Sequence, residues 1–133
     1  MGTDGKMVVS WAKLISEMHH GNSNSARPSA FKKVIGQFNP TFEGYEQHDS
    51  QECINTILDF IHEDLYRKEK KPYVETGETE GKTDKEASIE AWNKHVYRNE
   101  SVILDLFHGQ FKSRTSCNQC DKVSIVFDPF LMI

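Results

Sequence analysis

No stretch of the sequence approaches the roughly 20 consecutive apolar residues that a membrane-spanning helix needs. The first residues, Met-Gly-Thr-Asp-Gly-Lys, contain no apolar core of the kind that a secretory signal peptide carries. We therefore expect no membrane partner. We also expect the protein to be intracellular, in the cytoplasm, the nucleus or both.

The sequence also lacks an excess of positive charge. Lysine and arginine together number 16 against 20 aspartates and glutamates, which gives a net charge of −4. The basic residues form no stripe of the kind that phosphate contacts require, so nucleic acid is not an expected partner. Hydrophobic residues make up only 37% of the 133 positions, which allows one modest core.

Cysteine is scarce, and its three copies are an odd number, which argues against a disulfide framework. Cys117 and Cys120 form a Cys-x-x-Cys pair whose thiolates can both bind one zinc ion. A structural zinc site normally has four ligands, so the pair would supply half of one. Two other interpretations stay open, inert reduced thiols and a redox pair, although a redox pair needs a helix start where a strand is predicted. Cys53 is interpreted as a small buried apolar side chain.

The six histidines have no spacing typical of metal ligands, and we expect surface or capping roles for them. They are His19, His20, His48, His62, His95 and His108.

Apolar residues at intervals of three and four predict helices in the first hundred residues. Gly21 and Gly36 are expected to end the first two helices, and Pro28 to open the second. The predicted helices cover residues 8–20, 28–36, 49–65 and 84–99. Because residues 76–84 hold no large apolar side chain, we expect a mobile surface insertion at about 74–84.

From Ser101 onward apolar residues alternate, which predicts strands. One strand is expected around residues 102–106 and another around residues 123–127, on either side of the cysteine pair. The predicted fold class is therefore α+β and mainly helical, with a β-hairpin at the end. The apolar run that follows Val123 looks like part of a larger fold, because a self-contained domain would cover it.

Asp49 and Glu52 are predicted to form a capping box at the start of the third helix. The Asp49 carboxylate can accept hydrogen bonds from first-turn amides, while Glu52 can reach back to the cap residue. Local helix physics therefore explains both carboxylates without any ligand.

Two segments carry distinctive motifs. They read Phe42-Glu43-Gly44-Tyr45-Glu46-Gln47-His48-Asp49-Ser50-Gln51-Glu52, and Leu106-Phe107-His108-Gly109-Gln110-Phe111 running into Cys117-Asn118-Gln119-Cys120. The first resembles the Gln-Gln-Asp-x-x-Glu box of the ubiquitin-specific protease family of cysteine deubiquitinases, and the second resembles the entry to the zinc-bearing fingers of that family. The resemblance is strongest to the subfamily that also carries DUSP and ubiquitin-like domains.

The resemblance implies a partial catalytic domain of papain-like fold, in which residues 1–100 are thumb helices and residues 101–133 begin the fingers. It implies a ubiquitin carboxyl-terminal hydrolase that cleaves isopeptide bonds at the C-terminal glycine of ubiquitin. It further implies that the basic tail of ubiquitin is held by four polar side chains, those of Gln47, Asp49, Gln51 and Glu52, and that Cys117 and Cys120 are zinc ligands.

The sequence departs from the family pattern in three respects. His48 replaces the second glutamine of the box, and neither the cysteine box nor the histidine box of the family is present. The second Cys-x-x-Cys of the zinc ribbon is absent as well. We therefore expect the chain alone to be inactive, and the alternative function is a non-catalytic module that binds ubiquitin or another partner. Two chains could also share one zinc ion or exchange their terminal hairpins to form a dimer.

Overall fold

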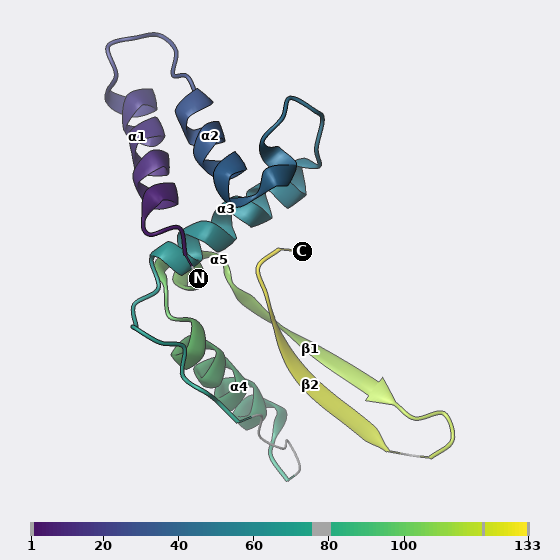
Figure 1. Cartoon of the computed structure of the whole chain (residues 1–133). Helices are drawn as coiled ribbons and strands as arrows, with labels where there is room; N and C mark the ends of the chain where they lie inside the picture. Colours follow the sequence, from purple (N-terminus) through teal and green to yellow (C-terminus); the bar gives the residue numbers. More distant parts are fainter. Residues whose placement is uncertain (1, 76–80, 121, 133) are drawn as a thin grey trace. The chain divides into compact units, whose positions relative to one another are not determined.

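The computed structural model describes residues 2–75, 81–120 and 122–132. Within these ranges about half of the residues are helical and the sheet has two strands, which confirms a mixed α and β fold (Figure 1). The chain divides into two compact units, Met1–Tyr66 and Arg67–Ile133. No helix in the described ranges is both long and apolar enough to cross a bilayer.

The described part of the first unit, residues 2–66, contains three α-helices and one turn of 3-10 helix. These are α1 (Lys6–His20), α2 (Ser29–Phe38), η1 (Pro40–Phe42) and α3 (Ser50–Asp64). Helix α1 contacts both α2 and α3, and the Trp11 ring lies 5.2 Å from the Phe31 ring. The buried apolar residues of this unit are Met7, Phe31, Ile35, Phe42 and Ile61. The helices expected over residues 8–20 and from Asp49 are confirmed.

Gly36 does not end α2, so that prediction was wrong. The helix continues to Phe38, and Gly36 is buried within it. A Cβ atom on Gly36 would lie 2.9 Å from the Cα of Glu43, closer than carbon atoms tolerate. The glycine therefore allows the chain after η1 to approach the helix closely, and it leaves the helix uninterrupted.

The second unit contains α4 (Asp84–Asn99), α5 (Val102–Phe107), β1 (Gly109–Ser116) and β2 (Val123–Phe130). The start of α4 carries a full capping box. The Thr83 hydroxyl accepts a hydrogen bond from the Glu86 amide at 3.3 Å, and the Glu86 carboxylate accepts one from the Thr83 amide at 2.9 Å. The helix expected over residues 84–99 is confirmed. Of the predicted insertion at 74–84, residues 76–80 lie outside the described residues.

Residues 102–106 form helix α5 where a strand was predicted, so that expectation was wrong. Ser101 caps the helix, since its hydroxyl accepts a hydrogen bond from the Leu104 amide at 3.1 Å. The neighbours Ile103 and Leu104 are both buried, a pattern that alternation between two faces of a strand does not produce. Short apolar runs are ambiguous between helix and strand, and here the cap decides.

The two strands form an antiparallel hairpin in which Gly109 pairs with Phe130 and Ser116 pairs with Val123. The Phe111 and Phe130 rings stack at the base of the hairpin with centroids 4.0 Å apart. The strand expected around residues 123–127 is confirmed, and the strands flank the Cys-x-x-Cys segment as predicted.

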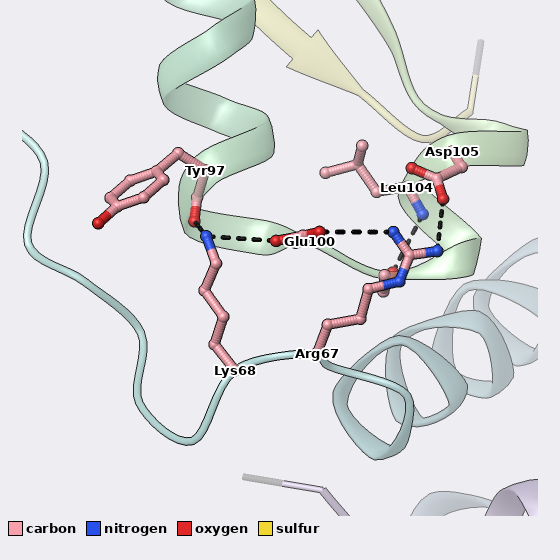
Figure 2. Close-up of polar contacts among 7 residues, drawn as sticks. Arg67, Lys68, Tyr97, Glu100, Leu104 and Asp105 are labelled. Carbon is pink, nitrogen blue, oxygen red and sulfur yellow. Dashed lines mark hydrogen bonds and ion pairs between the residues drawn. The ribbon is translucent and has the colours of Figure 1, made fainter.

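A polar cluster joins the start of the second unit to its helices (Figure 2). The Arg67 guanidinium lies 2.7 Å from an Asp105 carboxylate oxygen and 3.8 Å from Glu100. The Lys68 ammonium lies 3.4 Å from the other Glu100 oxygen and donates to the Tyr97 carbonyl. These contacts connect the segment after Tyr66 to the junction between α4 and α5.

Candidate functional site

The four polar side chains expected to hold a basic tail lie around the start of α3. Gln47 and Asp49 belong to the segment that enters the helix, and Gln51 and Glu52 belong to its first turn. All four are exposed. They therefore present amide and carboxylate groups to solvent within one short stretch of chain.

Asp49 caps the helix with only one of its two carboxylate oxygens. Its Oδ1 accepts a hydrogen bond from the Gln51 amide at 2.7 Å, while its backbone is extended, with φ −64° and ψ 126°. Among the described residues Oδ2 has no hydrogen-bond or ion-pair partner. The capping role predicted for Asp49 is confirmed, and it leaves one oxygen available to a ligand.

Glu52 does not complete the capping box within the described ranges. No hydrogen bond joins its carboxylate to the Asp49 backbone, in contrast to the reciprocal pair of Thr83 and Glu86 at α4. The local explanation for Glu52 is therefore weaker than the sequence indicated. Because no hydrogen bond among the described residues holds this exposed carboxylate, it can bind a cation without losing an internal bond.

A groove of about 360 Å³ opens beside this turn. His48, the residue that departs from the family box, lies edge-on to the Phe42 ring with centroids 5.3 Å apart. Cys53 is only half-buried in the groove wall, so the expectation of a buried side chain is met in part. The lining residues are Lys32, Ile35, Phe42, Gly44, Tyr45, Glu46, His48 and Cys53.

The cysteine pair lies at the tip of the hairpin, with both thiols free and exposed. The Gln119 amide donates a hydrogen bond to Cys117 Sγ at 3.4 Å, and the Cys117 amide donates to the Lys122 carbonyl at 3.0 Å. The hydrogen bond from Gln119, followed by those from Cys120, lowers the pKa of the Cys117 thiol. Such donors favour the thiolate, which is the form that binds a metal.

Two cysteine thiols are ligands of the type that zinc prefers, and by themselves they would make up half of a structural site. Within the described residues, no group of three or more histidine, cysteine or acidic side chains is close enough to hold a metal ion. Two further ligands would have to come from elsewhere to complete a tetrahedral site.

Sequence reasoning missed two local arrangements. His95 Nε2 lies 3.0 Å from His108 Nδ1, and the two rings stack at 5.2 Å. These residues are 13 positions apart, so no helical spacing signals the pair. The Lys32 ammonium, on α2, donates hydrogen bonds to the carbonyls of Glu43 and Gly44. No sequence motif predicts this contact.

Comparison with known proteins identifies the family. The model described as "Ubiquitin carboxyl-terminal hydrolase" matches residues 2–130. Ubiquitin carboxyl-terminal hydrolase 4 of Rattus norvegicus is 47% identical over 130 residues, which are 98% of this chain and 14% of that protein. Ubiquitin carboxyl-terminal hydrolase 15 of Homo sapiens is 45% identical over 130 residues, which are 98% of this chain and 13% of that protein.

A plant protein shows the same likeness. The putative ubiquitin carboxyl-terminal hydrolase 11 of Arabidopsis thaliana is 41% identical over 133 residues, all of this chain and 15% of that protein. The chain belongs to the ubiquitin carboxyl-terminal hydrolase family, which confirms the resemblance to ubiquitin-specific proteases. It spans only about one seventh of the length of these relatives.

Proposed function

We propose that this chain forms the thumb helices and the first finger hairpin of a papain-like catalytic domain in a thiol-dependent deubiquitinase. The protein would hydrolyse isopeptide bonds at the C-terminal glycine of ubiquitin, acting on ubiquitinated proteins in the cytoplasm, the nucleus or both. The observation that carries the proposal is the family match over residues 2–130. The relatives that match are named ubiquitin carboxyl-terminal hydrolases.

The site that this chain would contribute is the polar surface at the start of α3. Asp49 Oδ2 and the Glu52 carboxylate would bind the basic tail of ubiquitin through charge-assisted hydrogen bonds, with Gln47 and Gln51 beside them. The support is geometric: all four side chains are exposed, and the cap occupies only one Asp49 oxygen. Capping and binding therefore do not compete for the same atom.

A charge-only substitution separates binding from capping. Asp49→Asn keeps an oxygen that accepts from the Gln51 amide, so the free energy of unfolding should change by less than about 0.5 kcal/mol. Ubiquitin affinity, measured by NMR titration or calorimetry, should fall about two- to fivefold, because one exposed ion contact is lost. Glu52→Gln should act in the same direction.

The matched control is Glu17→Gln, which removes one exposed negative charge from α1 in the same unit. It should leave ubiquitin affinity unchanged. Equal losses in all three variants would mean that net charge, and not this surface, governs binding.

The isolated chain should not catalyse the reaction, because its sequence contains neither the cysteine box nor the histidine box of the family. Incubation with a fluorogenic ubiquitin substrate should release no fluorophore. Appreciable hydrolysis by the chain would contradict the proposed division of the active site. If Cys53→Ala then abolished that hydrolysis, Cys53 would be the nucleophile.

The second candidate is a non-catalytic module that binds ubiquitin or another partner. The exposure of the α3 surface supports it. The full-length transcript distinguishes the two: a cysteine box before these residues and a histidine box after them would establish the protease. Stop codons or degenerate boxes would establish the binding module.

Cys117 and Cys120 would supply two of the four ligands of a structural zinc ion, and zinc would cross-link the hairpin tip to the ligands completing the site. In the isolated chain, two copies could share one ion or exchange hairpins. Native mass spectrometry with added zinc should then show two chains with one zinc ion, and Cys117→Ser should abolish that species. A monomer at micromolar concentration would contradict the dimer.

A further inference from the structure

Lys32 makes three contacts with the loop that leads into α3. From the first turns of α2, its ammonium donates hydrogen bonds to the carbonyl of Glu43, at 3.2 Å, and to the carbonyl of Gly44. The same ammonium lies 4.4 Å from the centroid of the Tyr45 ring. One side chain thus holds three consecutive residues of the loop.

The rest of the loop has few other attachments. Its first part is fixed by buried Phe42 and by the close approach of Glu43 to Gly36. Its last residue before the cap, His48, packs on the Phe42 ring. Within the described residues, Lys32 is the only side chain that bonds to the backbone of residues 43–48. Tyr45 is 98% exposed, so burial does not hold it in place.

We propose that Lys32 is a positioning residue for the ubiquitin-binding surface at the start of α3. It fixes the turn at Glu43–Tyr45 and thereby sets the path of the chain through Gln47 to Asp49. This inference rests on the function proposed above for that surface. A loop that is already ordered loses little conformational entropy when the partner binds, so the partner binds with higher affinity than it would to a mobile loop.

The sign of the charge effect separates this mechanism from simple electrostatics. Lys32 carries a positive charge beside a surface proposed to bind a basic tail, so removing it would strengthen binding if charge alone mattered. Positioning predicts the opposite result. Lys33→Met gives the matched control, because Lys33 is exposed on the same helix, carries the same charge and has no partner among the described residues.

The test uses the whole 133-residue chain with ubiquitin as the probe. Lys32→Met keeps the aliphatic stem and removes the donors. Ubiquitin affinity should fall about fivefold in Lys32→Met, since ordering about one extra residue costs that much. It should be unchanged or slightly higher in Lys33→Met. Lys32→Arg keeps donors and a cation near Tyr45, so it should restore most of the affinity.

A second measurement is independent of ubiquitin. Backbone ¹⁵N order parameters of residues 44–48 should be near 0.85 in the unaltered chain and should fall toward about 0.6 in Lys32→Met, with no change in Lys33→Met. Unchanged order parameters in Lys32→Met would overturn the inference. So would a mobile loop with unchanged ubiquitin affinity. An unaltered chain that does not bind ubiquitin would overturn the binding role proposed for the start of α3, while the order parameters would still decide whether Lys32 fixes the loop.

Discussion

Asp64, the last residue of α3, caps the first turn of α1 together with Thr3. The Thr3 hydroxyl donates to Asp64 Oδ2 at 2.5 Å and accepts from the Met7 amide at 2.8 Å, and the Thr3 amide donates to Asp64 Oδ1. Helix α1 begins after Gly5, which offers no side-chain cap of its own. A carboxylate at the end of α3 is unfavourable for its own helix but favourable at the start of α1. The contact therefore stabilises the packing of two helices.

Substitution of Asp64 should destabilise the first unit. Asp64→Asn replaces one acceptor with a donor that faces the Thr3 amide or hydroxyl, so the free energy of unfolding should fall by about 1 to 3 kcal/mol. Urea denaturation followed by circular dichroism measures this change. Glu17→Gln, an exposed substitution on α1, should shift the midpoint very little. Equal midpoints for Asp64→Asn and the unaltered chain would contradict the capping role.

The same carboxylate predicts how stability depends on pH. Burial alone would raise the pKa of Asp64, but hydrogen bonds from Thr3, Gly5 and Val8 outweigh it and lower the pKa below its usual value of 3.8. A lowered folded-state pKa contributes stability above the unfolded-state pKa, and that contribution is lost as the pH falls through the folded-state value. The stability difference between the unaltered chain and Asp64→Asn should be largest near neutral pH and should shrink below about pH 4. A constant difference down to acid pH would contradict this assignment.

Gly109→Ala should disrupt the base of the hairpin. A Cβ atom on Gly109 would collide with the tip of the Phe130 ring, which itself stacks on Phe111. The ring must move, and overpacking of this kind costs about 1 to 3 kcal/mol. Thermal denaturation and the NMR shifts of the Phe130 ring measure the effect. Gly44→Ala is the control, because its nearest atom would be 3.9 Å away.

The hydrogen bond between His95 and His108 allows a prediction of which ring nitrogens carry the protons. The Asn99 amide nitrogen lies 3.2 Å from the His95 carbonyl, which only accepts hydrogen bonds, and 3.2 Å from His95 Nδ1. Nδ1 of neutral His95 therefore accepts, Nε2 carries the proton, and His108 Nδ1 accepts from it. Long-range ¹⁵N–¹H NMR spectra should show the Nε2 tautomer for both rings. An Nδ1 tautomer at His95 would contradict this direction of donation.

Arg67 should contribute less to stability than its several contacts indicate. Its side chain is 45% exposed, and those of Asp105 and Glu100 are 44% and 36% exposed. Solvent screening limits such pairs to less than about 1 kcal/mol. Arg67→Met should lower the free energy of unfolding by no more than that at low salt, and by less at 1 M salt. A larger loss that does not depend on salt would show that the guanidinium acts mainly through packing.

Sequence patterns predicted those elements whose signals are local. The helix after Asp49 was correctly placed because its cap and its apolar spacing lie within a few residues of each other. The hairpin strand from Val123 was found by alternation. Residues 102–106 were misassigned because a run of five residues satisfies both the helix period and the strand period. Gly36 was misassigned because, in sequence alone, a glycine that ends a helix cannot be told from one that lets a neighbouring segment pack closely.

The sequence by itself determined the family, the positions of most helices and the exposed polar box before α3, since all of these depend on the order of neighbouring residues. Only the tertiary structure showed that Asp64 caps a helix more than fifty residues away and that His95 meets His108. It alone showed Lys32 holding the loop before Asp49. Such contacts arise when packed helices bring distant side chains within hydrogen-bond reach, and no local pattern records that distance.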